Sequence, residues 1–305
     1  MEQVDMPDIG LLAHGHPGVL LAHALLAHGI PLRVYMSRPE SLHALASQGA
    51  TLVEHQKQLA RPGGIVISCW PDEQAALRHA VEDQGMLAHL GPGGLQLCLA
   101  PLSPHVATEL ERLSARRSCA FLAGMLLAGP STGHVPSLSL LLSGQAAAKA
   151  RLLPLLSSAL PIFDLGEACA AAPLMGLAAT LLAGTTIEAL GEALALLDAF
   201  GLGRDSFFRF LRETGWHARL SGEISERLCQ RDVARQDGSL SVDEGMHLAR
   251  LTRKVAISVG LALTSMEPVL AHLQAAQIAG YGDQDWTLLS MFAGDSVRQR
   301  TRRRL

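Results

Sequence analysis

The chain has 305 residues, of which 49% are hydrophobic and 4% aromatic, and its formal net charge is −3. This length allows two domains with separate cores, and the small net charge gives no reason to expect a nucleic acid as partner. The five cysteines are odd in number, widely spaced and without a CxxC pair. They predict neither a zinc site nor a disulfide framework, and they fit a cytoplasmic protein.

The first predicted element is a buried strand over residues 9–12, followed by a glycine-rich turn and a helix from about Val19 to His28. The turn reads A-x-G-x-x-G, where the dinucleotide-binding fingerprint reads G-x-G-x-x-G. In that fingerprint the glycines let the backbone approach a pyrophosphate and let the helix pack on the strand, while the helix N-terminus attracts the anion. The predicted cofactor contacts are Ala13, His14, Gly15, His16, Pro17 and Gly18.

Two features of this turn leave an alternative open. Ala13 carries a Cβ where the tightest turn favours glycine, so an ordinary strand-to-helix turn is the other reading. His14 and His16 are not expected to bind a metal, because no acid or cysteine joins them.

A second strand is predicted over residues 31–35, and the adenine ribose is read where such a strand ends. An acid at that point selects NAD through the ribose 2′-hydroxyl, whereas a cation suits the 2′-phosphate of NADP. The chain has Ser37 and Arg38 there and no acid. This predicts NADP with Ser37 and Arg38 as contacts; the alternative is an arginine exposed in a turn.

Further strands are predicted over residues 51–53, 64–69, 95–99, 119–122, 137–142 and 160–164, with helices between most of them. The alternation predicts an α/β domain of the Rossmann type over residues 1–165, with a doubly wound parallel sheet that binds ligands outside the carboxyl ends of its strands. Cys69 is the last residue of the predicted strand 64–69, and Trp70 and Pro71 follow it; Ala100 follows the predicted strand 95–99. These four residues are therefore predicted to contact the cofactor.

From Glu167 onward no strand is predicted, and a long Ala/Leu-rich helix reaches Phe200. Residues 168–187 carry no charge and have the length of a bilayer span, but Glu188 and Glu192 continue the same helical pattern, so we expect a helix buried within a protein and no membrane partner. Residues 166–296 are predicted to form an all-α domain for dimerisation and substrate binding, joined through this interdomain helix. Residues 297–305 are predicted to be a basic, disordered tail.

Several segments carry a resemblance to a known family: the glycine turn with its helix, VYMSRPESLHALASQGA (34–50), VISCWPD (66–72), FLAGMLLAGP (121–130), PSLSLLLSG (136–144) and the long helix. On these segments the chain resembles the β-hydroxyacid dehydrogenase superfamily and, within it, the imine reductases. The dehydrogenases of the superfamily have a Ser-Gly-Gly that binds a substrate carboxylate, where this chain has Leu127, Ala128 and Gly129. That difference favours the imine reductases.

The resemblance implies NADPH bound by the first domain, a homodimer with interlocked helical domains of the 6-phosphogluconate dehydrogenase type, and an active site in the cleft between subunits. The dehydrogenases have a catalytic lysine on the long helix, and imine reductases usually have aspartate or tyrosine there; the corresponding residue is Gly176, and the dehydrogenase asparagine one turn later falls on Ala179. The expected substrate is apolar, lined by Met125, Leu127 and Gly176.

Another group must then supply the proton. Asp243 and His247 lie four residues apart on one predicted helical face, in the family segment that closes over the partner's active site, and Thr180 lies one turn beyond Gly176. These three are the catalytic candidates; the alternative for Asp243 is a solvated acid at a helix start.

Two functions stay open at this stage. One is an NADPH-dependent reductase of a C=N or related C=O compound in specialised metabolism. The other is a non-redox relative that has lost the dinucleotide and binds or cyclises a biosynthetic intermediate.

Overall fold

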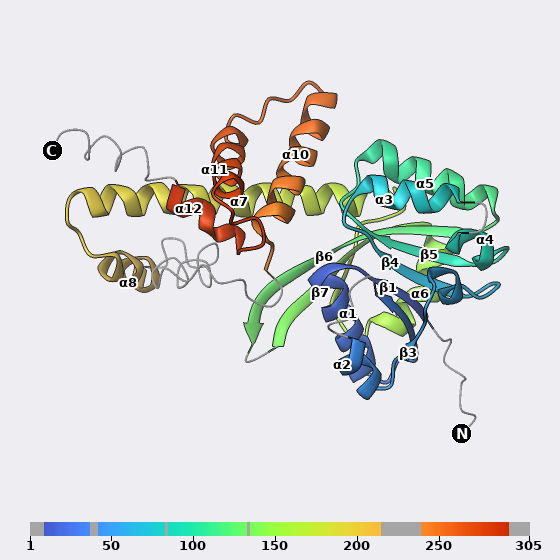
Figure 1. Cartoon of the computed structure of the whole chain (residues 1–305). Helices are drawn as coiled ribbons and strands as arrows, with labels where there is room; N and C mark the ends of the chain where they lie inside the picture. Colours follow the sequence, from blue (N-terminus) through green and yellow to red (C-terminus); the bar gives the residue numbers. More distant parts are fainter. Residues whose placement is uncertain (1–8, 37–41, 83–84, 133–134, 215–238, 293–305) are drawn as a thin grey trace. The chain divides into compact units, whose positions relative to one another are not determined.

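The computed structural model describes residues 9–36, 42–82, 85–132, 135–214 and 239–292 (Figure 1). It divides into two units, Met1–Gly176 and Leu177–Leu305, and each is described here by itself. The predicted fold class is confirmed, because an α/β unit with a largely parallel sheet is followed by a helical unit. The predicted basic tail lies outside the described residues.

The described part of the first unit contains an eight-stranded sheet with the order β3-β2-β1-β4-β5-β6-β7-β8. The strands are β1 (Ile9–Ala13), β2 (Leu32–Met36), β3 (Thr51–Leu52), β4 (Ile65–Cys69), β5 (Leu95–Leu99), β6 (Ala120–Thr132), β7 (Val135–Gly144) and β8 (Ile162–Asp164). All neighbours pair in parallel except β6 and β7, which are antiparallel. The sheet is thus parallel as predicted, apart from this one antiparallel pair, which the sequence did not indicate. Only residues 133 and 134 separate β6 from β7, too few for the crossover that a parallel pair needs.

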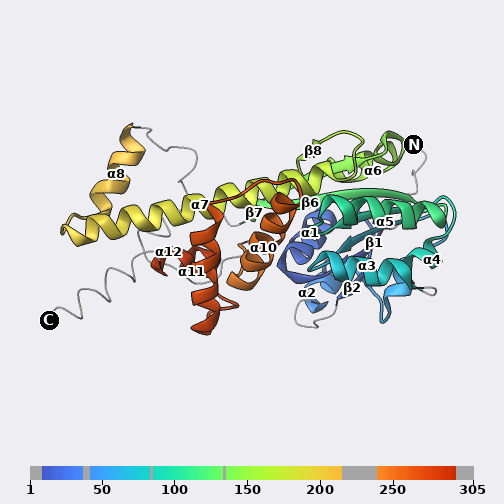
Figure 2. The ribbon, with the colours of Figure 1, turned by 90° about the horizontal axis from the view of Figure 1, so that it is seen from above.

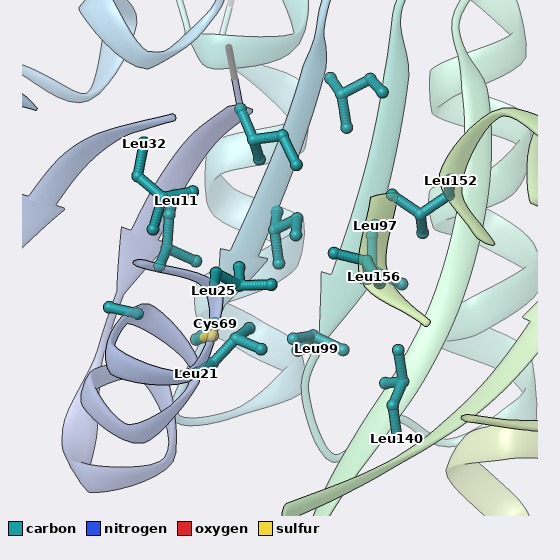
Figure 3. Packing of buried hydrophobic residues seen from close by; sticks show 14 of the residues in the cluster. Leu11, Leu21, Leu25, Leu32, Cys69, Leu97, Leu99, Leu140, Leu152 and Leu156 are labelled. Carbon is teal, nitrogen blue, oxygen red and sulfur yellow. The ribbon is translucent and has the colours of Figure 1, made fainter. Parts of the chain in front are cut away.

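Helices cover both faces of this sheet (Figure 1). One face carries α1 (Gly15–Ala27), α2 (Leu42–Ser47) and α6 (Ala146–Leu156); the other carries η2 (Gln56–Leu59), α3 (Glu73–Val81), α4 (Met86–Leu90) and α5 (Pro104–Arg116). Strands β1, β4 and β5 are buried at every position, as strands covered on both faces must be. Figure 3 shows the core on the α1 face, where Leu21 and Leu25 lie beside Cys69.

Two element boundaries differ from those expected. Helix α1 begins at Gly15 and not at Val19, so the glycine turn is itself the first turn of the helix. Strand β6 runs to Thr132, past the predicted end at residue 122, because its last residues pair with β7 and need no parallel neighbour.

Ser143 fixes the start of the long helix α7 (Ala171–Ala199). Its hydroxyl donates to the Cys169 carbonyl oxygen at 3.0 Å and accepts the Ala172 N–H at 3.0 Å. Next to it, the buried Lys149 ammonium lies 2.5 Å from Asp164 Oδ1 and lowers the pKa of that carboxyl. The first turn of α7 is thereby attached to the sheet.

The second unit continues α7 and adds α8 (Arg204–Thr214), α10 (Val242–Ser258), α11 (Met266–Ile278), η3 (Trp286–Leu288) and α12 (Leu289–Phe292). Ser241 and Glu244 form a capping box that starts α10. Ile187 of α7 packs in the core of this unit with residues of α10 and α11. Beside it, the buried carboxylate of Glu188 lies 2.8 Å from Nδ1 of His272.

One stretch among the described residues, Ala171–Gly191, has the length and mean hydropathy (1.4) of a membrane span. Its Ala172, Leu177 and Ile187 are buried within the chain. Leu174, Met175 and Leu182 of the same stretch are exposed, so its burial within the chain is partial.

Candidate cofactor and substrate site

The strand order places a topological switch point between β1 and β4, because the chain continues from β1 toward β2 on one side and from β4 toward β5 on the other. In sheets of this kind ligands bind outside the carboxyl ends of the strands at that point. The register pairs Leu12 with Ser68 and Cys69 with Leu99, so β1, β4 and β5 end at the same edge. The structure therefore brings the glycine turn together with the residues that follow β4 and β5.

Gly15 adopts a left-handed backbone conformation, with φ of +66°, and is exposed at this edge. His14 before it has extended backbone and makes no side-chain cap, and the first turn of α1 contains no acid. The positive end of the helix dipole therefore lies at the switch point, and no acid in the first turn of α1 neutralises it. Backbone N–H groups in this arrangement suit a phosphate.

Gly18 allows α1 to approach β1 closely. A Cβ at Gly18 would lie 3.0 Å from Ala13 Cα and 3.3 Å from Ala13 Cβ, which is tighter than ordinary packing. Ala13 itself is buried, and among the described residues Ser118 is the one non-glycine with positive φ, so Ala13 bears no such strain. The methyl group at position 13 is therefore accommodated by the glycine at position 18.

Cys69 ends β4 directly beneath the turn. Burial raises the pKa of its thiol to about 12, against a smaller opposing effect of a hydrogen bond with the His14 backbone. The thiol is therefore neutral at physiological pH and is not a nucleophile, and its side chain packs in the core on the α1 face.

Trp70 follows Cys69 and is buried, with its ring stacked on His79 at 4.3 Å between centroids. Its backbone N–H donates to the Leu99 carbonyl oxygen at 3.0 Å, which holds the ends of β4 and β5 together. Pro71 is exposed at the edge, whereas Ala100 is buried. Of these residues, Pro71 is the one exposed to solvent.

The predicted ribose contacts, Ser37 and Arg38, lie outside the described residues. Strand β2 ends at Met36, which pairs with Ala13. The chain thus reaches the same edge immediately before these two residues.

The residues predicted to line the substrate come from β6 and α7. Met125 and Leu127 are half-buried on β6, opposite Leu141 and Ser139 of β7. Met125 lies against the backbone of Gly176, where a Cβ would be 2.0 Å from its Sγ. The structure therefore brings Met125 and Gly176 into direct contact.

The three catalytic candidates all lie in the second unit. Asp243 is exposed in the first turn of α10, but its Oδ1 accepts from Gln277 Nε2 at 2.6 Å, so it also holds α10 to α11. His247 follows one turn later, and its Nε2 is buried with no hydrogen-bond partner among the described residues. Thr180 is buried on α7.

Sequence reasoning missed Glu73 at this edge of the first unit. Its buried carboxylate accepts the Ser103 N–H at 2.9 Å and joins the starts of α3 and α5, which lie side by side in Figures 1 and 2. The available signal was an acid directly after the Asp72 cap, which accepts from Ala75 N at 2.7 Å. Glu73 thus supports the loops that follow β4 and β5.

Comparison with known proteins agrees with this geometry. Residues 8–161 match the family described as the NAD binding domain of 6-phosphogluconate dehydrogenase. An uncharacterised oxidoreductase of Bacillus subtilis, YfjR, is 25% identical over 293 residues, which are 92% of this chain and 98% of the relative.

Two solved structures show the same fold along nearly the whole chain. The 3-hydroxyisobutyrate dehydrogenase from Salmonella typhimurium has a TM-score of 0.79 at 20% identity and covers 93% of this chain and 99% of its own. The imine reductase from Myxococcus stipitatus in complex with NADP+ has a TM-score of 0.61 at 21% identity, with coverages of 94% and 99%. The chain therefore belongs to the family of the 6-phosphogluconate dehydrogenase NAD-binding domain, and it shares its fold with 3-hydroxyisobutyrate dehydrogenases and imine reductases.

Proposed function

We propose that the protein is an NADPH-dependent reductase of a C=N compound, an imine or iminium ion, or of a related C=O compound, in specialised metabolism. The observation that most supports this proposal is the conformation of Gly15, which is exposed with a left-handed backbone at the start of α1, where no side chain caps the helix. A residue with a Cβ would lose about 1–2 kcal/mol in that conformation, so the turn is specialised. A pyrophosphate bound by backbone N–H groups is the ligand that such a turn fits.

The choice of NADP over NAD depends on Arg38, which follows the end of β2. Its guanidinium suits a 2′-phosphate, and positions 36–38 contain no acid to accept a ribose 2′-hydroxyl. The imine reductase from Myxococcus stipitatus in complex with NADP+ supports this choice by analogy.

We prefer a C=N substrate because β6 lacks the residues that bind a substrate carboxylate in the dehydrogenases. Leu127, Ala128 and Gly129 stand where the dehydrogenases have Ser-Gly-Gly, and the half-buried Met125 precedes Leu127 on the same face of β6. A hydroxy acid would lose hydrogen bonds to its carboxylate here, whereas an imine without a carboxylate would not. NADPH, when bound, supplies the hydride.

The chain's own groups orient the substrate and supply charge or a proton. We assign Asp243 to the stabilisation of an iminium ion, His247 to proton delivery and Thr180 to the lining of the site. We also propose a cytoplasmic homodimer in which one subunit's helices complete the other's site. The exposed Met175 and Leu182 on α7 support this assembly, because large apolar side chains on a core helix call for a cover.

A second candidate function is a protein that keeps the scaffold but has lost the dinucleotide. The observation in its favour is Gly176, which offers no proton donor at the position of the family's catalytic side chain. Such a protein would bind or cyclise a biosynthetic intermediate without a hydride.

Titration with NADPH and NADH, followed by Trp fluorescence, separates the two functions. We expect micromolar binding of NADPH and weaker binding of NADH. Arg38→Ala should remove the difference between them, and Ser37→Ala should reduce it less. Absence of NADPH binding, together with an empty groove in crystals grown with NADPH, would reject the reductase and leave the second function.

A further inference from the structure

The space that a side chain at Gly176 would need is occupied by Met125. A Cβ at Gly176 would lie 2.0 Å from Met125 Sγ, 2.9 Å from its Cγ and 3.1 Å from its Cβ. Heavy atoms do not approach a Cβ to 2.0 Å, since contact distances in cores are about 3.5–4.0 Å. No residue other than glycine fits at position 176 unless the thioether moves.

This contact is fixed by the framework around it. Ser143 of β7 pairs with Ala123 of β6, and Met125 lies two residues beyond Ala123, so all three side chains share one face of the sheet. The Ser143 hydroxyl accepts the N–H of Ala172, one helical turn before Gly176. The sheet register and the start of α7 together bring Met125 to Gly176.

We propose that Met125 determines specificity: its thioether takes the place of the family's catalytic side chain and gives the substrate site an apolar wall at that point. This inference rests on the proposed function, and it narrows the substrate to an imine or iminium ion that presents an apolar group, and not a carboxylate, to that wall. A thioether is unbranched and apolar, and it fills the space that a smaller side chain would leave to the substrate. It neither donates a proton nor pairs with an acid.

The first test is a double-mutant cycle in which the Tm of the intact protein is measured. Gly176→Ala should lower the Tm, because the methyl group collides with the thioether, and Met125→Ala should at least halve that loss by removing the sulfur. Gly184→Ala is the matched control on the same helix, because its Cβ would meet Val269 Cγ1 at 3.4 Å and Trp286 Cζ3 at 3.5 Å, which are ordinary contacts. It should raise the Tm by about 2 °C, as alanine does in a helix interior. An equal loss for Gly176→Ala with and without Met125 would overturn the proposal.

The second test measures the affinities of two amines by calorimetry, pyrrolidine and the bicyclic 1,2,3,4-tetrahydroisoquinoline, each with and without NADPH. Met125→Ala should shift the ratio of their dissociation constants at least about tenfold toward the larger amine, as expected when a pocket gains the volume of several heavy atoms. Leu126→Ala is the control, because Leu126 packs on the opposite face of the sheet with the α1-side core. It should leave the ratio unchanged.

The outcomes separate this inference from the proposed function. A ratio that Met125→Ala does not change, or an absence of binding by either amine to any variant, would overturn the role of Met125. If the protein does not bind NADPH, the reductase is rejected. The Tm values of the Gly176 and Met125 variants would still test the contact between these two residues.

Discussion

Gly18 and Ala13 are in such close contact that an added Cβ on Gly18 would lie 3.0 Å from Ala13 Cα and 3.1 Å from Ala13 C. Both of these nearest atoms belong to the backbone of β1, which cannot move without disturbing the sheet. Helix α1 can therefore approach β1 this closely only with glycine at position 18. The approach sets the place at which the helix N-terminus meets a bound pyrophosphate.

Gly18→Ala is accordingly expected to destabilise the protein by about 1–3 kcal/mol, the usual cost of overpacking. It should also weaken NADPH binding, because α1 is pushed away from the switch point. Ala13→Gly should not rescue the variant, since it removes the methyl group but not the two backbone atoms. Urea unfolding and NADPH titration measure both effects, and full rescue by Ala13→Gly would show that the backbone contact is not the cause.

Gly15 and Gly29 allow backbone strain to be separated from ligand binding. Both are exposed with positive φ, +66° and +72°, at opposite ends of α1. Gly15→Ala and Gly29→Ala should each cost about 1–2 kcal/mol of stability, because both place a Cβ in a left-handed conformation. Only Gly15→Ala should reduce the affinity for NADPH, as measured by fluorescence. Equal affinities for the two variants would remove Gly15 from the cofactor site.

Local patterns in the sequence predict much of the first unit. Short apolar runs bounded by glycine or proline gave β1, β4 and β5 within one residue at each end, because such strands are buried on both faces and are recognised without their partners. The ends of these strands then identified the edge of the sheet at which a ligand binds, because ligands bind outside the carboxyl ends of parallel strands. The pairing of β6 with β7 was not predictable in this way, because a sheet register depends on which strands meet.

The candidate site likewise has one part that the sequence predicts and another that depends on contacts between distant residues. The residues of the glycine turn are contiguous, so their shared edge followed from the sequence. Met125 and Gly176 are distant in the sequence, and their contact depends on Ser143 fixing α7 to β7. The hydrogen bond from Gln277 to Asp243 is likewise a contact between helices, which no periodicity in α10 records.

Cys69 and Cys98 provide a test of burial at the cofactor edge. Burial raises the pKa of each thiol to about 12. In a Cys229→Ser background, a thiol reagent at pH 8 should therefore not label either cysteine in the folded protein, and it should label both in urea. Rapid labelling of the folded protein would show that the edge is open to solvent.

The same shift predicts how stability depends on pH. The pKa of a thiol in the unfolded chain is about 8.5, so below that pH both states are protonated and the contribution of each buried thiol is complete. Above it the unfolded chain loses protons first, and each thiol should reduce stability by about 1.4 kcal/mol per pH unit until the folded pKa is reached. Urea unfolding at pH 8 and pH 10 measures the slope. Cys98→Ala should reduce it, and an unchanged slope would exclude that thiol as its source.

Asp243 and His247 allow a structural role to be distinguished from a catalytic one. The Asp243 carboxylate accepts from Gln277 at 2.6 Å and so links α10 to α11. Asp243→Ala should therefore lower stability by about 1 kcal/mol. His247, in contrast, is expected to lower the stability of the folded state, because its buried Nε2 has no hydrogen-bond partner in the described part of the chain.

A hydrogen-bonding group on a ligand could supply the partner that His247 Nε2 lacks among the described residues, which makes this nitrogen a candidate contact. His247→Phe should leave the free energy of unfolding unchanged or higher, because it removes the buried nitrogen and keeps a ring of similar size. It should lower kcat for a cyclic imine about 10²-fold, the usual contribution of a positioned proton donor, and change KM little. Stopped-flow measurement of NADPH oxidation gives both constants. If kcat is retained while the Tm rises, His247 is a packing residue, and the proton then comes from Thr180, from Asp243 or from solvent.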